Sequence, residues 1–352
     1  MKKLYEEAVE LLKELISTPA LSGEEQGTAA VIERFLTQRG VSDIHRLHNN
    51  VWAFNRDYDA AKPTILLNSH HDTVKPNPAY TRNPFEAAVE DGRLYGLGSN
   101  DAGASVVSLL SVFLHYYDRS DLAYNLCVAI TAEEENSGSR GLECVIPHLG
   151  ELEFAIVGEP TLMQLAIAER GLVVIDCIAH GRAGHAAREE GDNAIYRAMK
   201  DIEWFRSYRF PEESELFGAV KMTVTIIEAG SQHNVVPAEC RYTVDIRVTD
   251  KYTNEEIVDT IRRHVESEVR PRSTRLTPSS ISPDHPIVKA GVALGRQTYG
   301  SPTTSDQALL SIPSLKLGVG DSGRSHSADE FVWLREIEEG IELYIKMLNQ
   351  IL

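Results

Sequence analysis

The sequence predicts an α/β fold in which a mostly parallel, helix-covered sheet is interrupted by an inserted α+β sandwich. Three observations lead to this prediction. Strand-like runs alternate with helical patterns as far as Glu159, which is the order of a parallel sheet with helical connections. Strands then follow one another, with two helices among them, up to about residue 275. From His285 onward the first pattern returns, which indicates that the middle region is an insertion.

Two helices are predicted at the start of the chain. Apolar residues of the first helix, over residues 4–16, recur at the spacing of one helical face: Leu4, Ala8, Leu11, Leu12 and Leu15. The capping-box pattern Ser-Gly-Glu-Glu at residues 22–25 predicts a second helix that runs to about Gly40.

Three strand-like runs follow, and each ends at acidic residues or histidines. The runs cover residues 64–68, 126–131 and 154–157, with helices expected at 104–117 and 141–149 between them. Because the carboxyl ends of parallel strands lie along one edge of a sheet, active sites of such folds gather there. The sequence therefore predicts an active site at the edge where these strands end.

The insertion is predicted to contain further strands and helices. After Glu159, strands are expected at residues 165–169, 172–179, 220–228 and 241–248, and two helices among them at 193–205 and 254–269. Residues 270–274, Arg-Pro-Arg-Ser-Thr, suggest a return linker, and a short strand at 314–318 and a closing helix at 334–352 complete the first domain. We therefore expect a catalytic domain of residues 1–168 and 276–352 with an inserted domain of residues 169–275.

The composition excludes several classes of partner. A formal net charge of −17 argues against nucleic acids and anionic membranes, which favour basic surfaces. No apolar stretch approaches the roughly 18 residues of a membrane span, and no export signal develops at the N-terminus. The four cysteines lie far apart, which disfavours structural zinc bound through sulfur. We expect a cytoplasmic protein.

Five clusters of acidic residues and histidines are the most informative feature of the chain. They lie at residues 69–72, 99–101, 133–135, 158–160 and 325–330. Two adjacent divalent ions that share a carboxylate need roughly five or six oxygen and nitrogen ligands, which no single helix or loop can present. Together the clusters supply one such set.

Each cluster also has a simpler explanation when it is taken alone. Asp101 precedes a helix in a glycine-rich turn, where aspartate commonly acts as an N-cap. The run Glu133 to Glu135 would suit a solvated acidic loop, because adjacent carboxylates repel one another. His70 and His71 would suit the exposed end of a strand. The metal-site interpretation therefore rests on the five clusters occurring together.

In this order, the clusters resemble the metal-site motifs of the M20 family of metallopeptidases and amidohydrolases, and the resemblance spans the chain. Gly181-Arg-Ala-Gly-His185-Ala resembles the family's lid-domain histidine motif. Gly230-Ser-Gln-His-Asn234-Val-Val-Pro237, followed by Asp245-Ile-Arg247, resembles its substrate-carboxylate segment. Residues 300–307 and 320–330 look most like the acetylornithine deacetylase group.

The chain also departs from the family pattern at several positions. Ser69 stands where glycine is common, Leu97 where arginine is usual, and Glu133 where aspartate is usual. Asp101 is followed by Ala102-Gly103 in place of the usual Met-Lys or Ser-Lys. None of these differences removes a ligand, but they bear on the subgroup and so on the substrate.

The resemblance implies a ligand set for two divalent ions. His70, Asp101 and Glu159 would hold the first ion, and Glu135 and His326 would hold the second, with Asp101 bridging both. Shells rich in oxygen with one imidazole per ion suit Zn²⁺, and Co²⁺ or Mn²⁺ would also fit. Residues i and i+2 of a strand point to the same side, so Asp72 can accept a hydrogen bond from the far nitrogen of His70.

The resemblance also implies the remaining roles. Glu134 would be the general base, and Asp72 would belong to the catalytic set. His185 of the inserted lid or dimerisation domain would stabilise the oxyanion, often in a neighbouring subunit, with Asn234 donating a hydrogen bond to the same region. Arg247 would bind the substrate carboxylate through its planar fork, although a salt bridge on a surface strand is the simpler explanation of that residue. A homodimer is therefore expected.

The predicted activity is metal-dependent hydrolysis of the amide bond of a small N-acyl-amino acid. The expected substrate is N-acetylornithine, or N-acetylcitrulline or N-succinylornithine, in arginine biosynthesis. Succinyl-diaminopimelate desuccinylase or a dipeptidase of the same family is the alternative. A metal-binding relative that has lost catalysis is a third reading, which the presence of Glu134 and Asp72 disfavours.

Overall fold

The computed structural model describes residues 2–188 and 190–352, and these residues form two compact units. The first unit comprises Met1–Ile167, Ser280–Tyr299 and Ser305–Leu352, and the second comprises Ala168–Ser279 and Gly300–Thr304. The unit boundaries lie within a few residues of the expected domain boundaries, except that residues 300–304 join the second unit.

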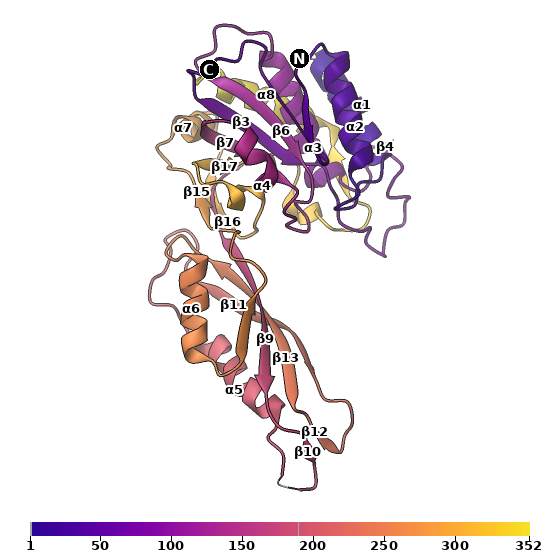
Figure 1. Ribbon diagram of the computed structural model, residues 1–352. Helices are drawn as coiled ribbons and strands as arrows, with labels where there is room; N and C mark the ends of the chain where they lie inside the picture. The colour runs from indigo at the N-terminus through magenta and orange to yellow at the C-terminus, as the bar shows by residue number, and fades with distance from the viewer. Residues whose placement is uncertain (1, 189) are drawn as a thin grey trace. The chain divides into compact units, whose positions relative to one another are not determined.

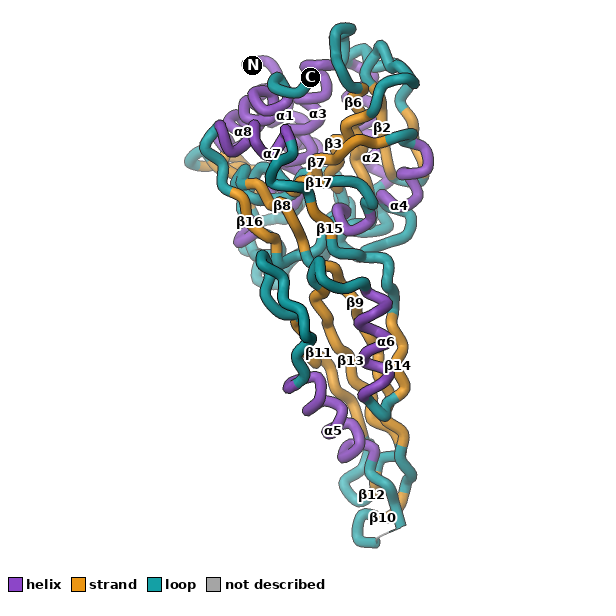
Figure 2. The backbone as a smooth tube through the Cα atoms, turned by 90° about the vertical axis from the view of Figure 1, so that its left-hand side faces the viewer, coloured by secondary structure: helices purple, strands orange, loops and turns teal. Residues whose placement is uncertain are grey.

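A mostly parallel sheet forms the centre of the first unit (Figure 2). Strand β3 pairs in parallel with β6 and β7, and β17 pairs in parallel with β7. Antiparallel strands β1 and β2 extend one edge. In sheet order the strands are β1 (His45–Leu47), β2 (Asn50–Phe54), β6 (Asn125–Thr131), β3 (Thr64–His70), β7 (Leu152–Val157), β17 (Ser314–Lys316), β8 (Leu165–Glu169) and β15 (Ser279–Ser280), and β16 (Thr298–Ser301) pairs with β8.

Helices cover both faces of this sheet, so every residue of β3 and β6 is buried. On one face, Ile65 and Leu67 join a large apolar core, whereas Leu66 points to a smaller core on the other face. The large core includes α1 (Lys2–Ile16), α2 (Gln26–Gln38), α3 (Ala104–Tyr116), α7 (Pro286–Ala293) and α8 (Leu334–Leu348). The smaller core includes α4 (Leu142–Val145), which a 3₁₀ turn at Ile146–His148 continues.

A small antiparallel sheet accompanies the main sheet of the first unit. Its order is β18 (Phe331–Trp333), β5 (Arg93–Tyr95) and β4 (Ala88–Glu90). Strand β18 directly follows residues 325–330, and β5 directly precedes the glycine-rich turn that carries Asp101. Two segments far apart in the sequence are thereby fixed side by side.

The second unit is an antiparallel sheet with helices on one face (Figure 1). Apolar residues of α5 and α6 pack against β9 and β13 in a core of its own. A short ribbon of β10 and β12 continues from one end of the sheet. The sheet order is β11 (Lys221–Ala229), β13 (Glu239–Val248), β9 (Gly171–His180) and β14 (Glu268–Pro271), the ribbon is β10 (Gly184–His185) with β12 (Val235–Val236), and the helices are α5 (Ala194–Ser207) and α6 (Asn254–His264).

The predicted end of the last inserted helix is wrong. Helix α6 stops at His264, and residues 268–271, partly assigned to a linker, form β14. The cause is the buried carboxylate of Asp201, which accepts hydrogen bonds from the backbone N–H groups of Glu266 (3.1 Å) and Ser267 (2.9 Å). These bonds hold the chain in an extended conformation where the local pattern favoured a helix.

The predicted capping box at residues 22–25 is also wrong. Helix α2 begins at Gln26 without a side-chain cap. The Ser22 hydroxyl donates to the carboxylate of Asp72 (2.7 Å), and the buried Glu25 carboxylate accepts from the side-chain amide of Asn49 (2.8 Å). Both side chains contact distant residues, which a pattern of four neighbours cannot reveal.

Within residues 2–188 and 190–352, none of the helices combines the length and the apolar character that crossing a bilayer requires.

Gly318 provides a test of the packing between β17 and the end of β7. A Cβ atom there would lie 2.3 Å from the backbone oxygen of Glu159, so we expect Gly318→Ala to lower the free energy of unfolding by about 1–3 kcal/mol. Urea denaturation followed by circular dichroism would measure the change. The control is Gly323→Ala, whose Cβ would meet only the side chain of Asp321. Equal stability of the two variants would contradict the close packing.

Candidate metal centre

The expected ligands gather at the carboxyl edge of the parallel strands. His70 is the last residue of β3, and Glu135 and Glu159 follow β6 and β7. His326 follows β17, and Asp101 lies in the turn Ser99–Gly103, directly before α3. Because β3, β6, β7 and β17 run parallel, these loops meet at one edge of the sheet, as the sequence predicts.

One group of ligand atoms combines His70, Asp101 and Glu159. His70 Nε2 lies 3.2 Å from Asp101 Oδ1 and 3.6 Å from Glu159 Oε1, and the three ligand atoms fall within 4.8 Å of one another. The Glu159 Oε1 atom is buried and has no hydrogen-bond partner among the described residues. A buried carboxylate oxygen left without a donor is costly, and a cation at this place would satisfy it.

A second group combines Asp101, Glu135 and His326. His326 Nε2 lies 3.0 and 3.1 Å from the two carboxylate oxygens of Glu135, and 3.7 Å from Asp101 Oδ2. Asp101 therefore presents Oδ1 to the first group and Oδ2 to the second. This arrangement is that of a carboxylate shared by two ions, and the oxygen and imidazole donors fit divalent ions such as Zn²⁺.

Asp72 has a wider role than the predicted hydrogen bond to His70. His70 Nδ1 lies 3.1 Å from the backbone oxygen of Asp72 and 3.4 Å from its carboxylate. The same carboxylate accepts the backbone N–H groups of Glu134 (3.0 Å) and Glu135 (3.1 Å), as well as the hydroxyl of Ser22. Asp72 thus fixes the turn after β6 in addition to orienting the imidazole.

Glu134 lies beside the ligands without belonging to either group of three. Its Oε2 atom is 4.0 Å from His70 Nε2. Burial, together with the negative charges of Glu159 and Asp306, raises the pKa of Glu134 well above its usual range. A carboxylate of raised pKa beside a pair of cation sites has the properties of a general base.

Several ligands have shifted pKa values in the protein without ions, and those of His326 and Glu159 are raised above neutral pH. The hydrogen bond to Glu135 raises the pKa of His326 to about 9. Burial raises the pKa of Glu159 to about 8. Both groups therefore hold protons near neutral pH, and a cation must displace these protons to bind.

Sequence reasoning missed several residues that support the centre. The buried His71 bonds through Nε2 to the backbone oxygen of Asn49 (2.9 Å) and through Nδ1 to Thr28 Oγ1 (2.8 Å), joining α2 to the end of β3. Asp306, buried in the 3₁₀ turn Asp306–Leu309, accepts a hydrogen bond from Thr131 Oγ1 (2.7 Å) at the end of β6. No local pattern marks either residue, because their partners lie far away in the sequence.

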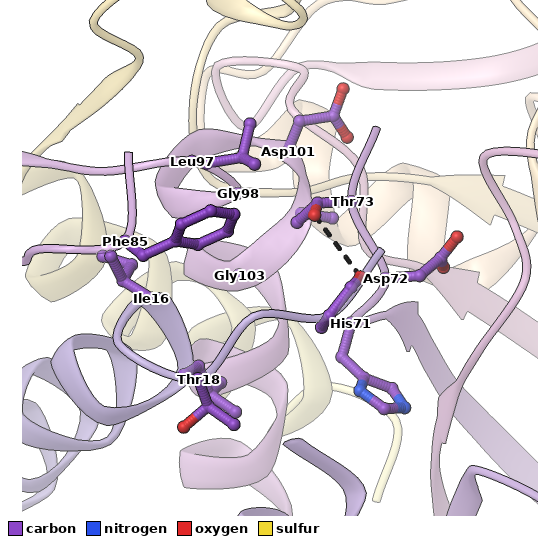
Figure 3. Close-up of a pocket in the computed structure, with 13 residues that line it drawn as sticks. Ile16, Thr18, His71, Asp72, Thr73, Phe85, Leu97, Gly98, Asp101 and Gly103 are labelled. Atoms are coloured by element: carbon purple, nitrogen blue, oxygen red, sulfur yellow. Dashed lines mark hydrogen bonds between the residues drawn. The ribbon is translucent and has the colours of Figure 1, made fainter. Parts of the chain in front are cut away.

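A small cavity lies behind the turn that carries Asp101. Its volume is about 20 Å³, which is room for a single water molecule. Apolar side chains, including Ile16, Phe85 and Leu97, line it together with Thr18. Figure 3 shows the carboxylates of Asp72 and Asp101 directed away from these apolar side chains. The cavity is thus part of the packing behind the ligands and is too small for a substrate.

The three predicted residues of the insertion lie at two ends of its sheet. His185 and Asn234 are close together, because β10 pairs with β12 and the Ala186 N–H donates to the Asn234 backbone oxygen (3.0 Å). Arg247 pairs with Leu172, at the opposite end of β13 from Cys240, which lies roughly 20 Å away. The second unit therefore brings His185 and Asn234 together and holds Arg247 apart from them (Figure 1).

The guanidinium group of Arg247 forms a salt bridge with a neighbour in its own strand and one further hydrogen bond. Nε and Nη2 donate to the two carboxylate oxygens of Asp245 at 2.8 and 3.0 Å, and Nη1 donates to Thr304 Oγ1 at 3.3 Å. This contact with Asp245 is the salt bridge that we gave from the sequence as the simpler explanation of Arg247.

Comparisons with known proteins agree with this geometry. A model of peptidase family M20/M25/M40 matches residues 66–350. Among curated relatives, succinyl-diaminopimelate desuccinylase of Acidiphilium cryptum is 24% identical over 367 residues, covering 97% of this chain and 98% of the relative. Succinyl-diaminopimelate desuccinylase 2 of a Ruegeria species is 26% identical over 276 residues, covering 73% and 69%.

Solved structures share the fold. Aminopeptidase PepT of Bacillus cereus has a TM-score of 0.77 at 17% identity and covers 99% of this chain, with 98% of its own chain matched. The M20 metallo-carboxypeptidase Sso-CP2 of Sulfolobus solfataricus has a TM-score of 0.75 at 17% identity, with 98% of each chain covered. These likenesses confirm the predicted fold class.

Binding of a divalent ion should release protons from this centre. Because the pKa values of His326 and Glu159 lie at about 9 and about 8, the apparent affinity for Zn²⁺ should rise with pH from about 6 towards 9 and then level off. Titration calorimetry in two buffers of different ionisation enthalpy would count the protons released near neutral pH. His326→Ala should release fewer protons, and binding without proton release would contradict the assigned ligands.

Proposed function

Because the chain belongs to peptidase family M20/M25/M40, we propose that it hydrolyses the amide bond of a small N-acyl-amino acid with two divalent ions. The observation that carries this proposal is the position of Asp101, whose two oxygens face two separate groups of ligands. Glu134 lies beside the first group, with Oε2 4.0 Å from His70 Nε2, and is a member of neither group. A catalytic role explains why so many acidic side chains converge in a largely buried place.

The chain's own residues supply binding and proton transfer. His70, Asp101 and Glu159 would hold one ion, and Asp101, Glu135 and His326 would hold the other. When bound, such a pair lowers the pKa of a water molecule and polarises the amide carbonyl. Glu134 takes a proton from the attacking water as its oxygen bonds to the amide carbon. Glu134 then delivers that proton to the leaving nitrogen as the carbon–nitrogen bond breaks.

The choice of ions is part of the proposal, and the chemistry of the donors supports it. Each group offers one imidazole and two carboxylates, a set that suits Zn²⁺ and would also accept Co²⁺. Asp72 keeps His70 in the orientation that directs Nε2 toward Asp101, since Nδ1 faces the backbone oxygen and carboxylate of Asp72.

The comparisons change the order of the candidate substrates. The relatives carry the name succinyl-diaminopimelate desuccinylase, which favours N-succinyl-diaminopimelate over the N-acetylornithine that the sequence predicted first. A role in arginine biosynthesis has no support from these relatives. N-acetylornithine stays a second candidate, because residues 300–307 and 320–330 resemble the acetylornithine deacetylase group.

A substrate panel tests this proposal. Zinc- or cobalt-loaded protein should release the acyl group from N-succinyl-diaminopimelate or, as the second candidate, from N-acetylornithine, with N-acetylcitrulline, N-succinylornithine and a dipeptide as comparisons. The matched control is Glu134→Gln, which should still bind both ions but lose turnover by several orders of magnitude. An active Glu134→Gln variant would show that the base is misassigned. Wild-type protein that binds ions and cleaves none of these amides would favour a non-catalytic role.

We also propose that two copies of the chain associate through the second unit. Strand β11 is an edge of the sheet, and most of its side chains are exposed, including Ile226 (49%) and Ile227 (54%). An exposed edge with apolar side chains is suited to pairing with another strand. In such a dimer, His185 and Asn234 of one copy would serve the catalytic residues of the other.

Mixed dimers test this assignment of His185. His185→Ala alone should lower turnover by about 100-fold or more, because an oxyanion donor is lost. Coexpression of His185→Ala with Glu134→Gln should restore roughly a quarter of wild-type activity, because each mixed dimer regains one site with both residues intact. If His185 serves its own chain, the mixture should be as inactive as either variant. Copurification of the two variants through a tag carried by only one of them would confirm that mixed dimers form.

A further inference from the structure

Glu330 is a buried carboxylate next to the ligand centre that has no place in either ligand group. Its side chain is 2% exposed, and it lies four residues after His326. Its Oε1 atom accepts the backbone N–H groups of Asn100 (2.8 Å) and Asp101 (2.9 Å), and its Oε2 atom accepts that of Gly98 (3.0 Å). All three donors belong to the turn that presents Asp101.

We propose that Glu330 is the positioning residue for Asp101, holding the turn so that the two oxygens of that carboxylate face the two ion sites. This inference rests on the proposed metal centre and names a residue that the ligand set does not include. Glu330 would act on the ions only through Asp101 and would not touch the substrate.

The chemistry of the contact supports a positioning role. Three backbone N–H groups point toward one place, and only a carboxylate offers enough acceptor capacity at two oxygens to bind all of them. Buried hydrogen bonds from backbone N–H groups to a carboxylate are stronger than those to a neutral acceptor, so three of them restrain the turn. Asp101 itself has extended, non-helical backbone angles (φ −119°, ψ 99°), and its N–H group donates directly to Glu330.

The backbone of Glu330 is fixed to the same region. The Gly96 N–H donates to the Glu330 backbone oxygen (3.0 Å), and the following strand, β18, pairs with β5. Residues 93–96 therefore hold the backbone at and after Glu330. The Glu330 carboxylate in turn binds the N–H groups of Gly98, Asn100 and Asp101. His326 lies on the same segment as Glu330. The Glu330 side chain therefore sets the position of Asp101 relative to the imidazole of His326.

The neighbouring residue Asp329 offers a matched comparison. Its carboxylate accepts the backbone N–H groups of Thr81 (2.9 Å) and Arg82 (3.0 Å), and also the Thr81 hydroxyl. Asp329 thus makes the same kind of contact as Glu330, from the same segment, but on a loop that carries none of the assigned ligands. A general loss of order in residues 325–330 should appear in both variants, whereas loss of Asp101 positioning should appear only in the variant of Glu330.

The test uses the full-length protein, freed of metal and then titrated with Co²⁺. Three variants are compared with the wild type: Glu330→Ala, Glu330→Gln and Asp329→Asn. Calorimetry gives the affinity and the number of ions. The visible absorption of bound Co²⁺ and its electron paramagnetic resonance report the ligand geometry and the coupling of two ions through a shared carboxylate. Thermal unfolding without metal gives the stability of each variant.

We expect Glu330→Ala to bind Co²⁺ about 10–100-fold more weakly in at least one site, as is typical when the partner of a ligand is removed. Its absorption should change, and the coupling between the ions should be reduced. Glu330→Gln should lie in between, because the amide keeps one oxygen for Asn100 and Asp101 but places an NH₂ group against the Gly98 N–H. Asp329→Asn should match the wild type.

Two results would overturn the inference. In the first, both variants of Glu330 bind two Co²⁺ ions with the same affinity and spectra as Asp329→Asn, whether or not they unfold at lower temperature. Glu330 would then stabilise the fold without positioning Asp101. In the second, wild-type protein binds no divalent ion, which would reject the metal centre together with this inference. Absence of amide hydrolysis by a protein that binds two ions would reject the proposed function and leave the role of Glu330 standing.

Discussion

The centre depends on holding like-charged carboxylates together in a buried place. Asp101, Glu134, Glu135 and Glu159 lie around one imidazole, His70, and burial raises the pKa of three of these acids. Such a group would spread apart on flexible loops. The turns that carry it are restrained by other acidic side chains that accept backbone N–H groups: Asp72 accepts those of Glu134 and Glu135, Glu330 accepts those of Gly98, Asn100 and Asp101, and Glu25 accepts that of Glu133.

This restraint works because the sheet beneath it is rigid. Strands β3 and β6, and β7 from Phe154 onward, are buried on both faces, so the loops at their carboxyl ends start from fixed points. The close approach of Gly318 to the backbone of Glu159 extends the same rigidity to the end of β7. The fold therefore determines where each ligand begins, and the buried acids determine where each one points.

Local sequence patterns predict the strands and ligands of the centre better than the hydrogen bonds that link them. The apolar runs before His70, Glu134 and Glu159 predict the strands, and the five ligand clusters meet as the sequence suggests. The partners of Ser22, Glu330 and Asp306 are separated from them by many residues, so no pattern of neighbours could reveal those contacts. Asp201 shows the same limit, since its bonds to residues 266–267 end α6 early. Which acyl group the protein accepts depends on the side chains around the substrate, and the periodicity of the sequence does not identify them.

The distance of His185 from Arg247 within the second unit has a consequence for activity at low protein concentration. If His185 acts in the site of a second copy, as proposed above, an isolated copy has no complete catalytic set, and dilution below the dissociation constant of the dimer would inactivate it. Hydrolytic capacity would then grow faster than linearly with the amount of chain present, and newly made copies would stay harmless to cellular amides until they meet one another.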